Sequence, residues 1–120
     1  MEDAIGRTYT APYADPARIV SGVNSSAGTG DTAVIAAQGA GNRIYLSALT
    51  VVNESATVAT RVDIKDGTTV IWRVFVPINS AHTVTFPVPL RLTANTALNM
   101  AAAVAVTTAY FAAVGFVSPV

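Results

Sequence analysis

One histidine and seven carboxylates are the side chains of this 120-residue chain that could support acid–base or metal chemistry. The histidine, His82, lies beside a turn without the neighbouring ligands or acids that a general base or a zinc site needs. Cysteine is absent, which excludes thiolate ligands and disulfides. Five of the acidic residues fall at turns or on an outward strand face: Asp15, Asp31, Glu54, Asp63 and Asp66. We therefore expect no enzyme activity, no metal or cofactor site and no small-molecule substrate.

Trp72 is the one large aromatic side chain that has two interpretations. An exposed tryptophan could be a platform for stacking sugar rings, as in carbohydrate-binding modules. In the sequence, however, Trp72 alternates in step with Val70, Val74 and Val76, and a large ring on such an apolar face fills a core. We expect Trp72 to be a core residue.

The composition indicates a single domain with few surface charges. Hydrophobic residues make up 52% of the chain and charged residues 12%, about half the usual share. Seven basic and seven acidic residues balance to a net charge of zero. Because no basic run is present, we expect no nucleic acid and no membrane among the partners. Low charge and a preference for arginine over lysine are typical of protein interfaces, so we expect an oligomer or a place within a larger assembly.

The elements that must position any site are organised around residues 61–76, RVDIKDGTTVIWRVFV. Side chains alternate between two faces in both halves of this stretch, and a period of two is possible only in extended strands. Asp66-Gly67 lies between the halves and favours the tight turn of a β-hairpin, in which φ is positive. The stretch therefore predicts two paired strands with Asp66-Gly67 as their turn.

Further strands are predicted on both sides of this hairpin. A short strand begins at Arg18, and the first strand of the hairpin is expected to extend over Thr57–Asp66. The other strands are Thr32–Gln38, Arg43–Asn53, His82–Phe86 and, after a link at Pro87-Val88-Pro89, Leu90–Leu92. Residues 43–53 have apolar side chains on both faces. That pattern suits either a central strand that is covered on both sides or a bulge near Ser47 that switches the inward face.

Residues 96–120 contain no charged side chain, so a membrane-spanning helix has to be considered. Polar residues interrupt the run, no cations flank it, and its residues alternate. We predict instead two strands that pair with each other through a turn at Thr107-Thr108. The outer face of this pair would be lined by alanine and glycine, flat enough to pack on another subunit. A helical hairpin is the remaining alternative, because alanine favours helix.

Eight or nine short strands without a helix predict an all-β, antiparallel β-sandwich over residues 18–120. The sandwich is expected to be jelly-roll-like; an immunoglobulin-like order of strands would give the same alternation. Residues 1–17 differ from the rest, since Pro12 and Pro16 disfavour both helix and central strand. We interpret them as an extended N-terminal arm that binds a neighbouring subunit through Ile5, Tyr9 and Tyr13. A frayed terminus is the alternative.

The segment from about Gly30 to Val117 resembles small structural proteins of tailed bacteriophages, of the type that decorates or cements the capsid. The resemblance lies in TAVIAAQGAGNRIYLSALTVVNES, ATRVDIKDGTTVIWRV and PLRLTANTALNMAAAVAVTTAYFAAVGFV. It implies a virion protein on the capsid exterior, made in the host cytoplasm, that binds the major capsid protein as a homotrimer and holds capsomers together. The anchors would be Ile5, Tyr9 and Tyr13, with hydrogen bonds at the interface from Arg18, Arg43 and Arg73.

Two other virion roles are compatible with the same pattern. One is a receptor- or carbohydrate-binding module of a phage fibre or spike, which would need an exposed aromatic platform. The other is a head-to-tail or tail component, which would form a ring of different symmetry. The sequence does not distinguish these locations, the host or the symmetry of the assembly.

Overall fold

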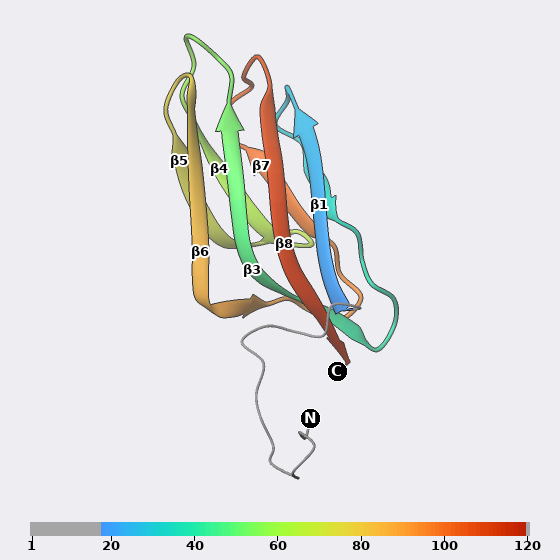
Figure 1. Cartoon of the computed structure of the whole chain (residues 1–120). Coiled ribbons are helices and arrows are strands. Elements are labelled where there is room, and N and C mark those ends of the chain that lie inside the picture. The colour runs from blue at the N-terminus through green and yellow to red at the C-terminus, as the bar shows by residue number, and fades with distance from the viewer. Residues whose placement is uncertain (1–17, 120) are drawn as a thin grey trace.

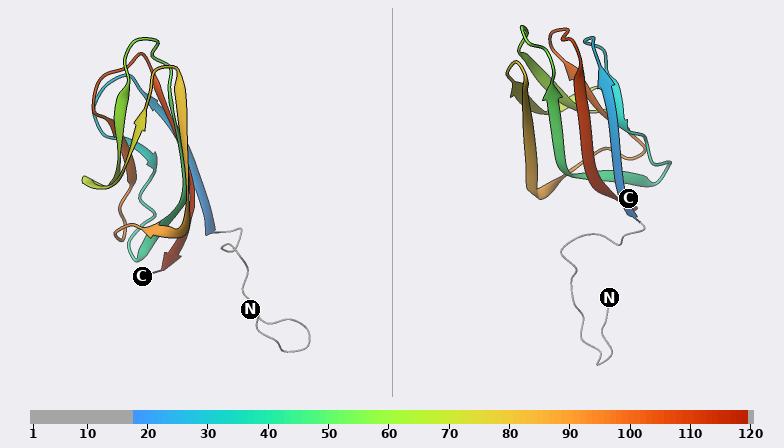
Figure 2. Two further views of the ribbon diagram at one scale, coloured as in Figure 1. Left: turned by 90° about the vertical axis from the view of Figure 1, so that its left-hand side faces the viewer. Right: turned by 45° about the horizontal axis from the view of Figure 1, so that its top comes forward.

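The computed structural model describes residues 18–119 as two antiparallel sheets packed face to face (Figures 1 and 2). The strands are β1 (Ile19–Ser26), β2 (Thr32–Ile35), β3 (Asn42–Asn53), β4 (Thr60–Asp66), β5 (Thr69–Val76), β6 (Ser80–Arg91), β7 (Leu98–Ala102) and β8 (Ala109–Pro119). One four-stranded sheet has the order β1-β8-β3-β6 and the other the order β2-β7-β4-β5. The predicted antiparallel β-sandwich is confirmed.

The strand order is that of a jelly roll. The chain pairs with itself like one long hairpin: β4 with β5, β3 with β6, β2 with β7, and β1 with β8. This long hairpin is rolled up so that alternate pairs belong to different sheets, which gives the eight-stranded, two-sheet jelly roll. An immunoglobulin-like sandwich would instead have an ABED and a CFG sheet. The order therefore decides between the two alternatives in favour of the jelly roll.

The β4–β5 hairpin, at the tip of this long hairpin, has the predicted strands but a different turn. Asp66 pairs with Thr69, so the loop residues are Gly67 and Thr68, and Gly67 has a φ of 63°. Glycine at the first loop position is the type II′ arrangement. Asp66 is thus the last strand residue, and its carboxylate accepts hydrogen bonds from the backbone nitrogen of Thr93 (3.0 Å) and from the Thr93 hydroxyl (2.7 Å).

β3 contains the bulge that was one of its two predicted alternatives. The register with both neighbouring strands shifts between Leu46 and Ala48. Before the shift Ile44 and Leu46 are buried, whereas after it Leu49 and Val51 are buried. The bulge at Ser47 therefore exchanges the inward and outward sets of side chains, because a shift of one residue turns every following side chain to the other face.

β6 is one bent strand, where the sequence predicted two short strands and a link. Thr85 pairs with Ala48 and Leu90 with Leu46, so residues 86–89 lie opposite Ser47 alone. Two of these four residues are proline, which has no N–H to give to the ladder. The strand bends here and runs across the lower end of the sandwich (Figure 1). Two other predicted strands are shorter than expected, since β2 ends at Ile35 and β4 begins at Thr60.

The two C-terminal strands exist, but the prediction that they pair with each other is wrong. β7 lies between β2 and β4, and β8 lies between β1 and β3 in the opposite sheet. The predicted outer face of alanine and glycine is also wrong for β8, because Ala109, Phe111 and Ala113 point inward and are buried. Within residues 18–119, no helix has the length and apolarity needed to cross a membrane.

The core lies between the two sheets, and nearly every strand contributes to it. Its largest fully buried apolar side chains are Ile44, Leu46, Leu49, Val51, Val62, Ile64, Val76, Leu92, Leu98, Met100 and Phe111. The expectation that Trp72 fills this core is wrong, since Trp72 is 42% exposed. It lies on β5, which is an edge strand, and its ring packs on that of Phe86 in a T-shaped arrangement with the centroids 5.2 Å apart.

Candidate functional site

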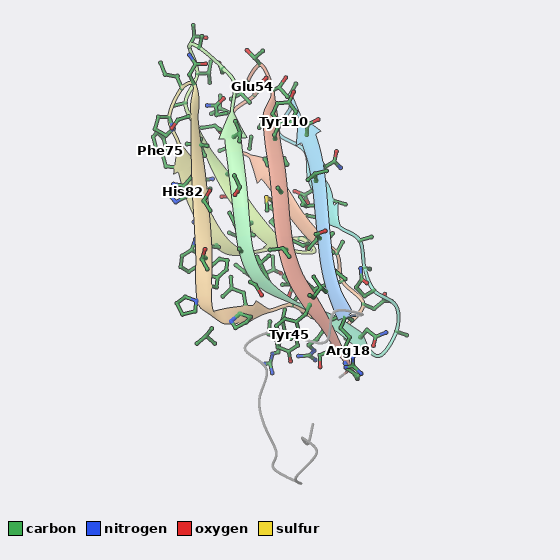
Figure 3. The ribbon with its side chains drawn as sticks, viewed as in Figure 1. Arg18, Tyr45, Glu54, Phe75, His82 and Tyr110 are labelled. Atoms are coloured by element: carbon green, nitrogen blue, oxygen red, sulfur yellow. The ribbon has the colours of Figure 1, made fainter. Side chains whose placement is uncertain are left out.

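The six residues predicted to bind partners are spread over the molecule. Ile5, Tyr9 and Tyr13 lie outside the described residues. Arg18 and Arg43 share one end of the β1-β8-β3-β6 sheet, because Arg18 leads into β1 and Arg43 pairs with Ser118 at the end of β8. Figure 3 shows Arg18 at this end, together with Tyr45, and Glu54 and Tyr110 at the opposite end.

Arg18 and Arg43 have different surroundings. Arg18 is exposed and lines a shallow depression of about 330 Å³. Arg43 is partly buried, and its Nε atom has no hydrogen-bond partner among residues 18–119. Beside them, the rings of Tyr45 and Phe116 stack with their centroids 5.0 Å apart. This end of the sheet therefore combines two guanidinium groups with an aromatic pair.

Arg73 belongs to the other sheet and is already engaged there. Its Nε atom lies 3.2 Å from Asp63 Oδ1, and Arg61 Nε lies 3.0 Å from the same oxygen. One carboxylate thus serves two guanidinium groups, which remain largely exposed. Lys65 and Asp31 form a further ion pair of 2.7 Å near this cluster. The outer surface of the β2-β7-β4-β5 sheet is therefore charged and internally paired.

The acidic residues that the structure describes do not form a cluster with one another or with the histidine. Asp31, Asp63 and Asp66 have the partners described above, and Glu54 is exposed in the loop after β3. His82 is exposed on β6, an edge strand, where it pairs in register with Val51 (Figure 3). Within residues 18–119, no group of three or more histidine, aspartate or glutamate side chains could hold a metal ion.

The most unusual surface is the outward side of the β1-β8-β3-β6 sheet. Cross-strand partners lie on the same side of a sheet, so the register defines rows of four side chains there. The row before the bulge of β3 is Ile19, Phe116, Tyr45 and Arg91, and the three rows after the bulge hold twelve uncharged side chains. We call these twelve residues the neutral face: Ser25, Tyr110, Val52 and Ala81; Val23, Ala112, Thr50 and Thr83; Ser21, Val114, Ala48 and Thr85. None of the twelve is charged: seven are valine, alanine or tyrosine, and the other five are serine or threonine.

The neutral face is open and slightly hollow. Val23 on β1 is 81% exposed, and Tyr110 and Val114 on β8 are also exposed. A depression of about 460 Å³ lies over its middle, between the side chains of β1, β8 and β3. The hydroxyl groups of Thr50 and Thr83 form a hydrogen bond with each other, with their oxygens 3.1 Å apart. An exposed surface without charge over three rows of a sheet is the kind of patch that marks a protein contact.

Sequence reasoning missed the neutral face for an identifiable reason. It requires β1, β8, β3 and β6 to be neighbours, and local alternation does not tell which strands pair. A signal was nevertheless present in the low charge of the whole chain and in the uncharged run after residue 95. The predicted arginines lie elsewhere, at the end of this sheet or on the other one.

Comparison with known proteins adds little to this description. No protein-family model and no curated protein matches the chain. Among solved structures, the coat protein of tobacco streak virus is similar, with a TM-score of 0.38 and 11% sequence identity over 89% of this chain and 92% of that one. At these values the likeness is weak, and the assignment of the fold depends on the strand order of the chain itself.

Proposed function

We propose that this chain is a non-enzymatic structural protein of a virus particle, which binds the outer surface of the capsid and stabilises contacts between capsomers. The observation that carries the proposal is a small jelly roll with an uncharged, exposed sheet face. The jelly roll is a frequent architecture of viral capsid domains. The resemblance of residues 30–117 to capsid decoration proteins of tailed bacteriophages supports the same role.

The proposed mechanism is mass action. A protein that binds only the assembled shell shifts the equilibrium towards assembly by its binding free energy. The major capsid protein is the proposed partner, and Ile5, Tyr9 and Tyr13 are the proposed anchors. Seventeen residues reach at most about 60 Å when fully extended, which is enough to cross to a neighbouring capsomer. A homotrimer would present three such segments, so each contact could be weak while the whole is strong.

Removing residues 1–17 should abolish capsid binding without unfolding the domain. The strands begin at Ile19, and the core described above is built entirely from residues after 33. We therefore expect the chain that starts at Arg18 to keep its far-ultraviolet circular dichroism and melting temperature. In sedimentation with capsids of the same virus, the full chain should co-sediment and the shortened chain should stay in the supernatant.

A double substitution distinguishes the contribution of the tyrosine side chains from that of the length of the segment. The double variant Y9A/Y13A keeps all residues but lacks both tyrosine rings, and it should lose most of the co-sedimentation. The matched control is T8A/T10A, which changes the neighbouring positions and should bind like the full chain. Unchanged binding after removal of residues 1–17 would contradict the proposed role of the arm.

Exposed aromatic side chains favour a second candidate, a glycan-binding module of a fibre or spike. Trp72 and Phe75 are 42% and 61% exposed and lie on the edge strand β5 (Figure 3 labels Phe75). Jelly rolls also occur in lectins. This candidate predicts that the protein binds glycans and that Trp72→Ala removes the binding, because a sugar ring would stack on the face of the indole. Capsid binding without glycan binding would exclude it.

A further inference from the structure

We propose that the neutral face is the surface through which copies of this chain bind one another, with the faces of three copies turned towards a common threefold axis. The proposal rests on the proposed function, since the homotrimer is part of it. It adds which surface builds the trimer and which side chains hold it. The occupant of the face is thus a second copy of the chain.

Charge is the first argument for a second copy. In a symmetric assembly every copy presents the same residues, so a charged surface near the axis would bring like charges together. The three rows of the neutral face carry no charge and avoid this repulsion. The outward side of the other sheet could not avoid it, because it carries Arg61 and Arg73 beside Asp63, and Lys65 beside Asp31.

Area is the second argument. Four strands about 4.8 Å apart, with three rows about 6.6 Å apart, give the face a planar area of about 380 Å². Three such faces turned to one axis amount to about 1,140 Å² in total, which is comparable to the roughly 1,000 Å² of one specific interface. This area is shared among three pairwise contacts, so each contact is small and the trimer depends on closure of the ring.

Shape is the third argument. Val23 projects from β1, which is the edge strand of its sheet, and is almost fully exposed. The depression beside it is lined by small side chains such as Ala48, Thr50 and Ala112. Around a threefold axis, the edge of one copy meets the face of the next. Val23 of one copy can then enter the depression of its neighbour, and the small residues allow the two backbones to approach closely.

The test is the mass of the full chain in solution, measured by light scattering for the wild type, Val23→Glu and Val88→Glu. Val88 is the matched control, because it is also valine, is 80% exposed and lies at the bend of β6, outside the three rows. The wild type and Val88→Glu should have three times the chain mass of 12.3 kDa. Val23→Glu should have the mass of one chain, since glutamate is too short to extend its charge out of the contact.

Circular dichroism shows whether the variants are folded, and so distinguishes loss of the trimer from loss of the fold. Both substituted positions are exposed, so both variants should retain the β-sheet spectrum; Val114→Glu, a second change on the neutral face, should repeat the result. A Val23→Glu variant that stays trimeric, a wild type that is a single chain, or equal dissociation of Val23→Glu and Val88→Glu would each overturn the proposal.

Capsid binding separates this inference from the proposed function. If Val23→Glu stays trimeric while binding to capsids still requires residues 1–17, the inference fails and the function stands. If Val23→Glu becomes a single chain while no form of the protein binds capsids, the inference stands and the function fails. If both hold, Val23→Glu should bind capsids more weakly than the wild type, because avidity is lost.

Discussion

Replacing Asn53 by leucine should destabilise the domain by about 3 to 5 kcal/mol, because each buried polar group that loses its partner costs about 1–3 kcal/mol. Asn53 is 1% exposed at the end of β3. Its amide nitrogen donates to the carbonyl of Val58 (2.8 Å) and approaches those of Pro77 and Val76 at 3.3 and 3.4 Å. Its Oδ1 accepts from the backbone nitrogen of Ser55 at 2.9 Å. One side chain thus joins the loop after β3 to the end of β5.

The measurement is the free energy of unfolding in denaturant, with Asn24→Leu as the matched control. Asn24 also donates to a backbone carbonyl, that of Ala33 at 2.9 Å, and also accepts from a backbone nitrogen, that of Ser25 at 2.8 Å. It is exposed, however, so water can replace both bonds. We expect a loss below about 1 kcal/mol for Asn24→Leu. Equal losses for the two variants would show that burial of Asn53 is not what makes its bonds matter.

The parts of the fold that could be predicted are those that depend on local pattern. The alternation in residues 61–66 and 69–76 defines two strands, and the short link between them contains a glycine that can adopt the positive φ of a tight turn. The mixed pattern of residues 43–53 left two alternatives, a central strand covered on both sides or a bulge near Ser47, and the register shifts at the second of these. In each case the cause lies within a few residues of its effect.

The parts that could not be predicted depend on contacts far apart in the sequence. β7 and β8 are close in the chain and both alternate, yet they belong to opposite sheets, because each is paired by strands nearer the N-terminus. Trp72 alternates in step with core residues, but its strand is an edge strand and its ring is left half outside. Alternation shows which side chains share a face of the strand, but not whether the strand lies at the centre or the edge of its sheet.

The sequence predicts the type of candidate site, but not the residues that form it. The low charge of the chain indicates a contact surface, and the neutral face is the surface that we propose for that role. Its members could not be named, because they come from four strands that the jelly roll brings together from both halves of the chain. The arginines predicted by the sequence are single residues of a type that is common at interfaces. Of these, Arg73 is bound to Asp63 within its own sheet, which leaves it less available for a partner.

Replacing Gly115 by alanine should destabilise the domain by about 3 kcal/mol, at the upper end of the usual cost of overpacking. Gly115 is buried on β8, where it pairs with Val20 of β1 and with Leu46 of β3, next to the bulge at Ser47. A Cβ atom at this position would collide with the backbone carbonyl of Tyr45. A flexible side chain could move aside, but this carbonyl belongs to a central strand that is paired on both sides. The strain therefore has to be taken up by the ladder between β3 and β8.

The control for this prediction is Gly30→Ala, measured in the same denaturant titration. A Cβ atom at Gly30 would have no neighbour within 4 Å. Alanine there restricts the unfolded chain more than glycine does, so we expect a change between zero and a gain of about 1 kcal/mol. The contrast between the two variants isolates the close approach of β3 and β8 from the general effect of removing a glycine. A loss below about 1 kcal/mol for Gly115→Ala would mean that the bulge relaxes easily. In that case the close approach of Gly115 to the carbonyl of Tyr45 would not be what constrains the pairing of β3 with β8.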